Sequence, residues 1–576
     1  MLRSFDTSVL IVGAGPVGLT LAMELASRGV DVTVTETRRA GEPPNVKCNQ
    51  VSARSMEIFR RLGLADRIRN TGLPPEYRND VAMCVSVLGT ELSRIKLPSR
   101  AGRVRGEKGA DGHWPCAEWG HRINQLHLEP LLFAHAAAQP CIHILNRTQF
   151  EEFIQDSNVV TAIARDLDSG EPVTIRCRYL AGCDGGRSTV RNAIGAELAG
   201  IPIYQRVQST YFRAPKLKSL LRGEPAWMYL AFNPRRCGTM MAIDGQETWL
   251  IHNFLYNDEP DYDSVDRDWA IRNIIGAPPG FEYEIISKED WIGRRLVADK
   301  FQNGRVFIAG DAGHLWIPHA GYGMNAGIAD AADLAWMLAA VLDGWAEPSL
   351  LEAYQAERQP ITDQVSHFAF NMAKQVSQQR REISADIERA DAAGAAMRAK
   401  IGQEAYDLYI QQQCCGGLNF GYFYEASPVI AYDGAAHPVY SMGSFESSSV
   451  PGCRAPHFWL SDKRSLYDAL GDGYGLIRFD REVAVDGLVA AAKHRGVPFK
   501  VLHIDDAEAA TLYAKKLVLV RPDRHVAWRA DVEPDDPLAL IDLIRGVPAM
   551  VSRERVLATA PAACRAWAPL LKPPSA

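Results

Sequence analysis

Three glycines near the start of the chain have the spacing of a dinucleotide-binding turn. The apolar residues 9–12 lead into Gly13-x-Gly15-x-x-Gly18, with Pro16 inside the turn, and a Leu/Ala-rich stretch of helical period follows. Gly13 permits a tight turn, Gly15 lets the backbone approach a pyrophosphate, and Gly18 lets helix and strand pack closely. The N–H groups and positive dipole of the helix N-terminus then attract phosphates.

An acidic residue follows at the distance of a ribose contact. Residues 30–35 have the β-branching of a second buried strand, which ends at Glu36, 23 residues after Gly13. A carboxylate there accepts from a ribose hydroxyl, so this order of elements predicts a dinucleotide site. The stretch alone leaves open whether FAD or a nicotinamide binds. Arg38 and Arg39 suit a 2′-phosphate or a solvated pair past the strand, and Glu36 favours the solvated pair.

Size and composition indicate a globular protein of two or three domains. With 576 residues, 47% hydrophobic and 23% charged, the chain exceeds one ordinary core. The net charge of −6 gives no basic footprint for nucleic acid, and no apolar run reaches the roughly 18 residues that span a bilayer. The eleven cysteines show no Cys-x-x-Cys and no zinc-like cluster. We expect a cytoplasmic protein with reduced thiols, no metal, no membrane contact and no nucleic-acid partner.

Two more strand-to-glycine turns carry acidic residues. Residues 179–182 run into Cys183-Asp184-Gly185-Gly-Arg187-Ser188 and a helix, where Asp184 either contacts a cofactor or caps the helix. Residues 305–309 run into Gly310-Asp311. The chain then continues through Pro318-His-Ala-Gly321-Tyr-Gly323-Met-Asn325 into a long Ala/Leu helix ending near residue 342.

The elements around these turns follow from their periodicity. Residues 54–63 predict a helix that begins Arg54-Ser-Met-Glu57, and residues 122–138 predict a helix that contains Gln125. Aromatic, alternating segments between residues 203 and 290 predict antiparallel strands of a mixed sheet. Rings such as Tyr211 and Tyr229 could wall an aromatic pocket, although most such rings belong to a core.

The last third of the chain changes character twice. Residues 346–412 are helical in pattern, and their charged run 375–399 predicts a solvated helix or linker. From residue 416, strands (474–479, 499–504, 516–520, 526–529) alternate with helices (485–495, 537–544). This alternation predicts a small α/β domain.

Four motifs together resemble one family. The glycine turn, Arg54-Ser-Met-Glu57, the Asp184 turn and the Gly310-Asp311 turn with its continuation occur in the order and spacing of the FAD-dependent aromatic hydroxylases. These single-component flavoprotein monooxygenases include p-hydroxybenzoate hydroxylase and phenol hydroxylase. Arg454-Ala-Pro-His457 and Val520-Arg-Pro-Asp523 resemble the thioredoxin-like tail of the phenol hydroxylase branch.

The resemblance implies an α/β fold in which a Rossmann-like FAD-binding domain is interleaved with a mixed-sheet substrate domain. We expect the FAD-binding domain at 1–75, 116–200 and 291–345, and the substrate-binding sheet at 76–115 and 201–290. A helical segment and linker would span 346–415, and a thioredoxin-like domain 416–576. The resemblance also implies a homodimer.

The resemblance also implies roles for individual residues. Glu36 would hold the adenosine ribose, Arg54 and Gln125 would lie against the pyrophosphate and flavin, and Asp311 would bind the ribityl or pyrophosphate region. Backbone N–H groups at the start of the long helix would face the flavin pyrimidine edge, where reduced flavin is negative. The cofactor-binding set is Gly13, Gly15, Pro16, Gly18, Glu36, Arg38, Arg54, Gln125, Asp184, Asp311, Pro318, Gly321, Gly323, Met324 and Asn325.

Two departures from the family pattern affect the reactive end. Pro318-His319-Ala-Gly321-Tyr322-Gly323 replaces the usual Pro-x-Gly-Gly-Gln/Phe-Gly beside the flavin. Asn49 stands where phenol hydroxylase has an acidic residue that helps to deprotonate the phenol. His319, Tyr211 and Tyr229 are the candidates to accept this proton, although a histidine there could equally be structural.

The implied reaction consumes NADPH or NADH to reduce FAD and transfers oxygen to a phenolic or related aromatic ring through a flavin hydroperoxide. The partners are then a small aromatic substrate and oxygen. The alternative is a related FAD enzyme with another outcome, a halogenase or a reductase. Halogenases of this lineage carry Trp-x-Trp-x-Ile-Pro, and here only Trp316-Ile-Pro318 matches its end. The C-terminal domain, without Cys-x-x-Cys, would serve as an oligomerisation module.

Overall fold

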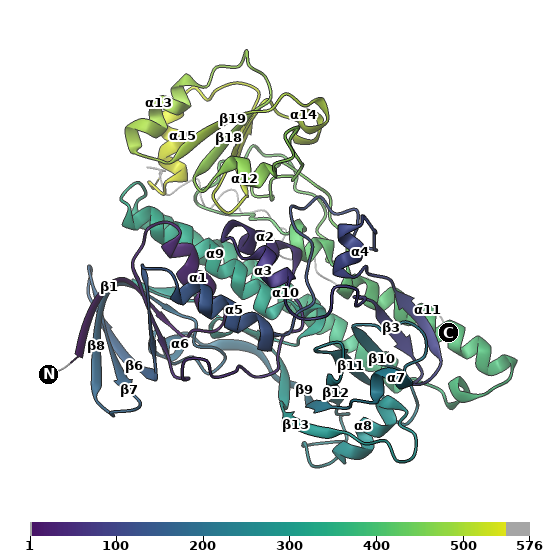
Figure 1. Cartoon of the computed structure of the whole chain (residues 1–576). Coiled ribbons are helices and arrows are strands. Elements are labelled where there is room, and N and C mark those ends of the chain that lie inside the picture. Colours follow the sequence, from purple (N-terminus) through teal and green to yellow (C-terminus); the bar gives the residue numbers. More distant parts are fainter. Residues whose placement is uncertain (1–2, 549–576) are drawn as a thin grey trace, which may run out of the picture.

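The computed structural model describes residues 3–548 and contains two large sheets and a small one (Figure 1). The first sheet has the order β15-β16-β8-β1-β2-β5, and β6 and β7 continue from β8. Its central strands are parallel, as crossover connections require, so the Rossmann-like α/β prediction is confirmed. The strands are β1 (Arg3–Val12), β2 (Val32–Glu36), β5 (Ile142–Asn146), β6 (Thr148–Gln155), β7 (Val160–Asp166), β8 (Pro172–Gly182), β15 (Gln302–Asn303) and β16 (Val306–Ile308).

Helices that are apolar on most sides fill the space beside this sheet. α1 (Pro16–Ala26) packs on α9 (Gly323–Leu342), which is buried almost throughout. By length and composition the segment His319–Leu342 could cross a membrane, but 94% of the tested stretch is buried inside the protein, as in a core helix. α2 (Ala53–Arg61), α3 (Ala65–Arg69) and α5 (Gln125–Ala137) lie beside this pair (Figure 1).

The second sheet has the order β17-β14-β9-β12-β11-β10-β3-β4, with β13 against β9. Two of its strands correct the expected boundaries, which gave residues 291–345 to the FAD-binding domain. β14 pairs with the 16-residue β9, and β17 pairs with β14, because β9 is long enough to reach both parts of the molecule. The strands are β3 (Val81–Cys84), β4 (Glu91–Ile95), β9 (Leu198–Arg213), β10 (Met228–Ala231), β11 (Gly238–Ala242), β12 (Thr248–Phe254), β13 (Glu284–Lys288), β14 (Trp291–Ala298) and β17 (His314–Trp316).

Helices cover both faces of the second sheet. α8 (Arg267–Ile275) packs its isoleucines on one face, and α10 (Glu352–Arg381) and α11 (Ala392–Gln413) cover part of the other. The charged run 375–399 is therefore not a solvated linker. Its apolar residues Val376 and Ile387 join a core with Met83 and Leu230 of the sheet, and most of its charged residues are exposed, although Arg380 is buried.

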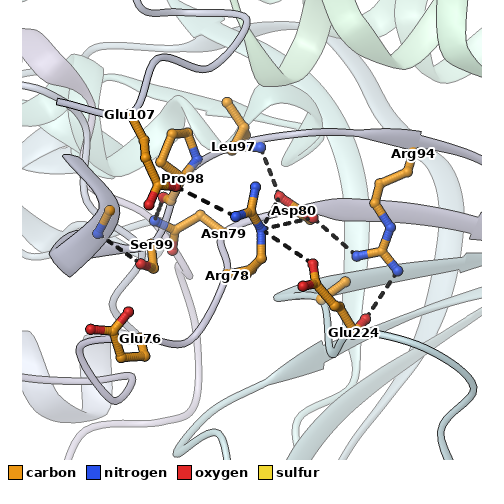
Figure 2. Close-up of polar contacts among 12 residues, drawn as sticks. Glu76, Arg78, Asn79, Asp80, Arg94, Leu97, Pro98, Ser99, Glu107 and Glu224 are labelled. Atoms are coloured by element: carbon orange, nitrogen blue, oxygen red, sulfur yellow. Dashed lines mark hydrogen bonds and ion pairs between the residues drawn. The ribbon is translucent and has the colours of Figure 1, made fainter. Parts of the chain in front are cut away.

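A buried carboxylate fixes the edge hairpin of this sheet (Figure 2). Asp80, 1% exposed, accepts a hydrogen bond from the Leu97 N–H at 2.8 Å. Arg94 binds the same carboxylate at 3.0 Å and Arg78 at 3.3 Å. The arrangement holds β3 and β4 in place under α11, which is a structural role.

The C-terminal sheet has the order β19-β18-β20-β21. β18 and β19 are parallel, and the other pairs are antiparallel, so a βαβ unit precedes a hairpin. The thioredoxin-like assignment stays a prediction, and residues 549–576 of that expected domain lie outside the described residues. The elements are β18 (Tyr474–Arg478), β19 (Phe499–His503), β20 (Leu517–Val520), β21 (Val526–Ala530), α12 (Leu466–Leu470), α13 (Asp486–Arg495), α14 (Ala507–Tyr513) and α15 (Pro537–Ile544); α4 (Arg100–Val104), α6 (Thr189–Ala193) and α7 (Leu217–Leu220) are short connecting helices.

A buried ion-pair cluster joins this C-terminal sheet to α10. Arg521, fully buried, binds Glu357 of α10 at 2.7 Å and Asp523 at 2.8 Å. Two carboxylates around one guanidinium offset its desolvation, so the contact fixes the two parts of the molecule against each other. The ten cysteines of residues 3–548 are free, and Cys564 lies outside that range.

Candidate active site

Of the three glycines in the turn between β1 and α1, two are packed against protein atoms and one, Gly15, is not. Gly13 has a φ of +103°, and a Cβ there would lie 2.5 Å from the carbonyl oxygen of Cys183. A Cβ at Gly18 would overlap the carbonyl oxygen of Gly13, so α1, which starts at Pro16, packs on its own turn. At Gly15, whose φ is −74°, a Cβ would meet no protein atom within 4 Å. Contacts within the protein explain why Gly13 and Gly18 have no side chain. No such contact explains Gly15, which leaves the N-terminus of α1 accessible to a phosphate.

Glu36, at the end of β2, begins a chain of charged side chains. Its carboxylate accepts a hydrogen bond from the Ala14 N–H at 3.0 Å, which places it beside the glycine turn. Arg38 binds Glu36 at 3.1 Å and Glu129 at 2.6 Å, and Gln125 donates to Glu129 at 2.8 Å. Burial raises the pKa of Glu36, but the bonds from Arg38 and Ala14 outweigh it and hold this pKa below its usual range. Glu36 is therefore an anion, as a ribose acceptor needs to be.

The expectation of a solvated pair is wrong for Arg38. Arg39 is exposed and lies near Asp168, but Arg38 is half-buried between two carboxylates. Its second partner, Glu129, comes from α5, which the sequence does not place beside β2. An arginine already held by two carboxylates is poorly suited to a 2′-phosphate.

Asp311 lies in a hollow at the end of β16. It belongs to the turn η1 (Gly310–Ala312), is exposed, and has no hydrogen-bond or ion-pair partner among residues 3–548. Surrounding protein nevertheless raises the pKa of its carboxyl through burial, with His314 and Lys47 opposing. Asp311 is thus accessible to solvent and yet surrounded by protein, which indicates that it lies in a concave part of the surface.

The Cys48 thiol shows which predicted residues come together. Burial and the nearby carboxylates of Asp311 and Glu129 raise its pKa to about 12, while Lys47 and the Met324 N–H oppose that rise. One point of the structure therefore lies near η1, near α5 and near the N-terminus of α9. The Gln125 N–H also donates to the Cys48 carbonyl at 2.9 Å, so Gln125, Asp311 and Met324 all lie near Cys48.

The turn before α9 has an unusual backbone. Gly321 has a φ of +60° and Ala320 a φ of +62°, and the Gln50 side chain donates to the Ala320 carbonyl. The Asn325 side chain accepts from the Ser52 N–H at 2.8 Å and donates to the Gly321 carbonyl at 2.7 Å. Its amide thus ties α9 to the loop before α2.

The first turn of α9 carries backbone donors that lack intrahelical acceptors, and the N–H of Met324 lies beside the Cys48 thiol. The first N–H groups of a helix lack intrahelical acceptors, and here they belong to Gly323, Met324 and Asn325. Pro318 lies exposed at the entry of the turn. The arrangement can receive an anionic or carbonyl edge of a ligand.

Asp184 has the structural role that the sequence left open. Its carboxylate accepts from the Ser188 hydroxyl at 2.5 Å and from the N–H groups of Thr189 at 2.8 Å and Val190 at 3.2 Å. These bonds cap α6. The cap itself adjoins the glycine turn, because a Cβ at Gly13 would lie 3.2 Å from the Asp184 Cα.

Arg54 does not join this group. Its guanidinium stacks 4.7 Å over the Tyr422 ring, and it lines a separate cavity together with Asp333 of α9 and residues of the C-terminal domain. The reason is the direction of α2, whose first turn faces Tyr422 rather than the Cys48 region. The predicted contact of Arg54 with the pyrophosphate therefore finds no support in its surroundings.

Tyr211 and Tyr229 lie on opposite faces of the second sheet. Tyr211 packs with Val46, Met241 and Leu250, and its hydroxyl has no hydrogen-bond partner within residues 3–548. Tyr229 is 4% exposed in the core under α8, and its hydroxyl accepts from the Ala226 N–H at 2.8 Å. Strand alternation turns Tyr229 away from the loop that carries Asn49, so its surroundings do not support the predicted catalytic role.

Asn49 and His319 adjoin the Tyr211 face through different elements. Asn49 donates to the Met241 sulfur at 3.4 Å and accepts from Asn124 at 2.6 Å. His319 Nδ1 lies 3.1 Å from the Gln412 Oε1 at the end of α11. Burial lowers the pKa of His319 to about 4, so its ring is neutral and a weak base at pH 7.

Two arginines on the same side of the sheet, the half-buried Arg122 and the buried Arg380, were missed by the sequence analysis. Arg122 lies 4.1 Å over the Trp227 ring and donates to Gln413 at 3.2 Å; burial lowers its pKa to about 10. Arg380 lies 3.9 Å over the Phe254 ring and donates to the Thr239 hydroxyl at 3.2 Å. Neither has a carboxylate within 4 Å among residues 3–548. No local sequence signal marks them, because their isolation depends on distant segments.

The residues present fit a dinucleotide. The open Gly15 turn and the ionised Glu36 adjoin each other and form one end of a cofactor path; Asp311 and the first N–H groups of α9, which lie near Cys48, form its other end. An apolar sheet face with Tyr211 adjoins the far end of that path. Fold and site together define an oxidoreductase that binds a dinucleotide cofactor and brings its reactive end to an aromatic-lined sheet.

Comparison with known proteins identifies the family. Residues 6–369 match the FAD binding domain family, and residues 448–546 match the aromatic-ring hydroxylase C-terminal family. The chain therefore belongs to the FAD-dependent aromatic-ring hydroxylases, which are monooxygenases, and its cofactor is FAD.

Relatives match nearly the whole chain. Phenol 2-monooxygenase of Pseudomonas sp. (strain EST1001) is 30% identical over 94% of this chain and 93% of its own. Tetracenomycin B2 monooxygenase-dioxygenase of Streptomyces olivaceus is 30% identical over 93% and 97%. Among solved structures, the rebeccamycin biosynthetic enzyme RebC with reduced flavin has a TM-score of 0.85 at 32% identity, covering 95% of this chain and 100% of that one. Aklavinone-11 hydroxylase with FAD and aklavinone has a TM-score of 0.78 at 26% identity, with the same coverage.

Proposed function

We propose that this protein is an NAD(P)H-consuming monooxygenase that hydroxylates a phenolic ring held against the Tyr211 face of the second sheet. The observation that carries the proposal is the pair Arg122 and Arg380. These two guanidinium groups have no carboxylate partner in the described part of the chain, and they lie on the side of the sheet that His319 also adjoins. An anionic aromatic compound supplies the charge that this region lacks.

In this proposal the predicted cofactor residues hold FAD in an extended conformation. The α1 N-terminus at Gly15 binds the pyrophosphate, Glu36 accepts from the adenosine ribose, and Asp311 accepts from the ribityl side. The N–H groups of Gly323 and Met324 face the flavin. When bound, reduced FAD supplies activated oxygen, and the chain supplies position and exclusion of water.

The phenol proton does not need a strong base at His319. Moving a proton from a phenol of pKa about 10 to a histidine of pKa about 4 costs about 8 kcal/mol. A guanidinium at about 5 Å, at an effective dielectric constant of about 20, instead stabilises the phenolate by about 3 kcal/mol, or about 2 pKa units. Arg122 and Arg380 therefore favour the ionised ring, with Tyr211 as a further candidate contact.

The nicotinamide would bind transiently. The sequence has one Gly-x-Gly-x-x-Gly turn, and FAD occupies it in this proposal. Phenol 2-monooxygenase among the relatives supports a phenolic substrate, whereas tetracenomycin B2 monooxygenase-dioxygenase suggests a larger one. The halogenase alternative gains nothing from Trp316, which stacks on His314 with ring centroids 4.5 Å apart.

The remaining expectations stay predictions. These are the homodimer, the cytoplasmic location and an oligomerisation role for the C-terminal domain. The homodimer would be tested by the mass of the purified protein in solution, and the oligomerisation role by the mass of a chain truncated before that domain.

A panel of phenols tests the proposal. The FAD-loaded protein is mixed with NADH or NADPH and with phenol, a hydroxybenzoate or a polycyclic phenol, and products are identified by mass. The proposal expects nicotinamide oxidation stimulated by one class, with a product heavier by one oxygen. Oxidation without a hydroxylated product in every class would contradict it.

A further inference from the structure

A second concave site lies apart from the cofactor path and is lined by residues of α2, α9 and the C-terminal domain; these three parts of the molecule lie next to one another in Figure 1. It is a cavity of about 300 Å³, at the lower end of the range of roughly 300–1,000 Å³ that holds small ligands. Of the predicted cofactor residues only Arg54 lines it. The charged residues around it are Arg54, Glu57, Arg60, Arg61, Asp333, Arg454, Asp468, Asp472, Asp523 and Arg524.

Most of these charges are already paired. Glu57 binds Arg454 at 2.7 Å, and Arg60 binds Asp468 at 2.8 Å. The remaining paired groups bind residues outside the cavity lining: Asp333 binds Tyr424, Asp523 binds Arg521, and Arg61 binds Glu24. Each of these groups therefore has a partner of opposite charge or a hydrogen-bond partner, although the Nε of Arg61 is buried without one among residues 3–548.

Two arginines are left over. Arg54 is only 7% exposed, and its guanidinium has ring contacts but no hydrogen-bonding partner within residues 3–548. Arg524 has a φ of +74°, and its Nη1 is buried without a partner. Burial and the nearby Arg61 lower the pKa of Arg524 to about 10. Asp472 is exposed and has no cation within 4 Å, so it does not complete either group.

We propose that this cavity binds a phosphate group between Arg54 and Arg524. A guanidinium is a planar fork that binds phosphate oxygens through two parallel hydrogen bonds, and a tetrahedral anion offers oxygens to two such forks at once. The source is either inorganic phosphate or the phosphate of a nucleotide. The bound group would join α2, which carries Arg54, to the C-terminal domain, which carries Arg524.

Calorimetric titration of the FAD-loaded full chain tests the site. Sodium phosphate is titrated at constant ionic strength against a sodium chloride blank. The expected result is one saturable site, weakened tenfold or more by Arg524→Gln and unchanged by Arg464→Gln, an exposed arginine of the same domain. Absence of saturable binding, or equal affinity in wild type and Arg524→Gln, overturns the proposal.

A second measurement does not depend on the variant folding. Wild-type crystals are soaked in tungstate, and anomalous density is expected between Arg54 and Arg524. Its absence from the cavity overturns the proposal. Adenosine 2′-phosphate and adenosine are titrated as well. Tighter binding of the nucleotide than of inorganic phosphate identifies a nucleotide ligand, and binding of inorganic phosphate alone identifies the free anion; either supports a phosphate site.

Discussion

Gly15 and Gly18 have one sequence signature but distinct physical roles, and alanine separates them. Gly15→Ala places a methyl group where no protein atom lies within 4 Å, on a backbone with an ordinary φ of −74°. Gly18→Ala drives a Cβ into the carbonyl oxygen of Gly13, closer than the 3.0 Å that real Cβ atoms keep. The first change should damage only cofactor binding, and the second should damage the fold.

The magnitudes follow from these contacts. A methyl group at Gly15 that costs one charged hydrogen bond to the pyrophosphate, about 1.5–3 kcal/mol, weakens FAD binding about 10–150-fold. The apoprotein should change in free energy of unfolding by less than about 0.5 kcal/mol, as for a surface substitution. Gly18→Ala overpacks the turn and should cost the apoprotein about 1–3 kcal/mol or more.

Two measurements on each variant test this reasoning. FAD affinity is measured by quenching of flavin fluorescence, and the free energy of unfolding of the apoprotein by urea denaturation. Unchanged FAD affinity in Gly15→Ala would refute the placement of the pyrophosphate. Equal destabilisation of the two apoproteins would refute the distinction between an open and a packed glycine.

Four further changes test other parts of the account. Arg122→Gln should raise the pKa of bound 4-nitrophenol by about 2 units, followed by phenolate absorbance, and an unchanged pKa would remove this arginine from the site. Tyr211→Phe should lower kcat/KM about tenfold or more if its hydroxyl touches the substrate, whereas Tyr229→Phe should leave kcat/KM unchanged; the reverse result would mean that the faces are misassigned. Arg521→Met, which strands Glu357, should lower the free energy of unfolding by about 3–5 kcal/mol in urea. Stability should fall as pH drops from 6.5 towards 4, because the unfolded chain protonates histidines that the fold keeps neutral. Equal urea midpoints at pH 7 and pH 5 would contradict this. The histidines whose pKa falls to about 3 or 4 in the fold are His121, His252, His319, His457 and His525.

Local sequence patterns were sufficient to predict the main elements of the fold. The glycine turn, the acid at the end of the second strand and the strand–helix alternation after residue 474 are set by neighbouring residues, and the structure has these elements close to where they were expected. The motif-based family resemblance is confirmed by the matches over nearly the whole chain.

Side-chain partners could not be found in this way. Arg38, just after β2, binds Glu129 of α5. Arg54 lies over the ring of Tyr422, which is far from it in the sequence. Strand periodicity separates the two faces of a sheet but does not say which face meets the cofactor, so Tyr211 and Tyr229 were expected together. Each of these outcomes depends on how distant elements dock.

Isotope labelling tests the central claim most directly. The FAD-loaded protein is supplied with NADPH or NADH and a phenol that stimulates nicotinamide oxidation, under an atmosphere of ¹⁸O₂. The account predicts a ring-hydroxylated product that carries one ¹⁸O atom. Consumption of the nicotinamide with no labelled hydroxyl group on the product would contradict it.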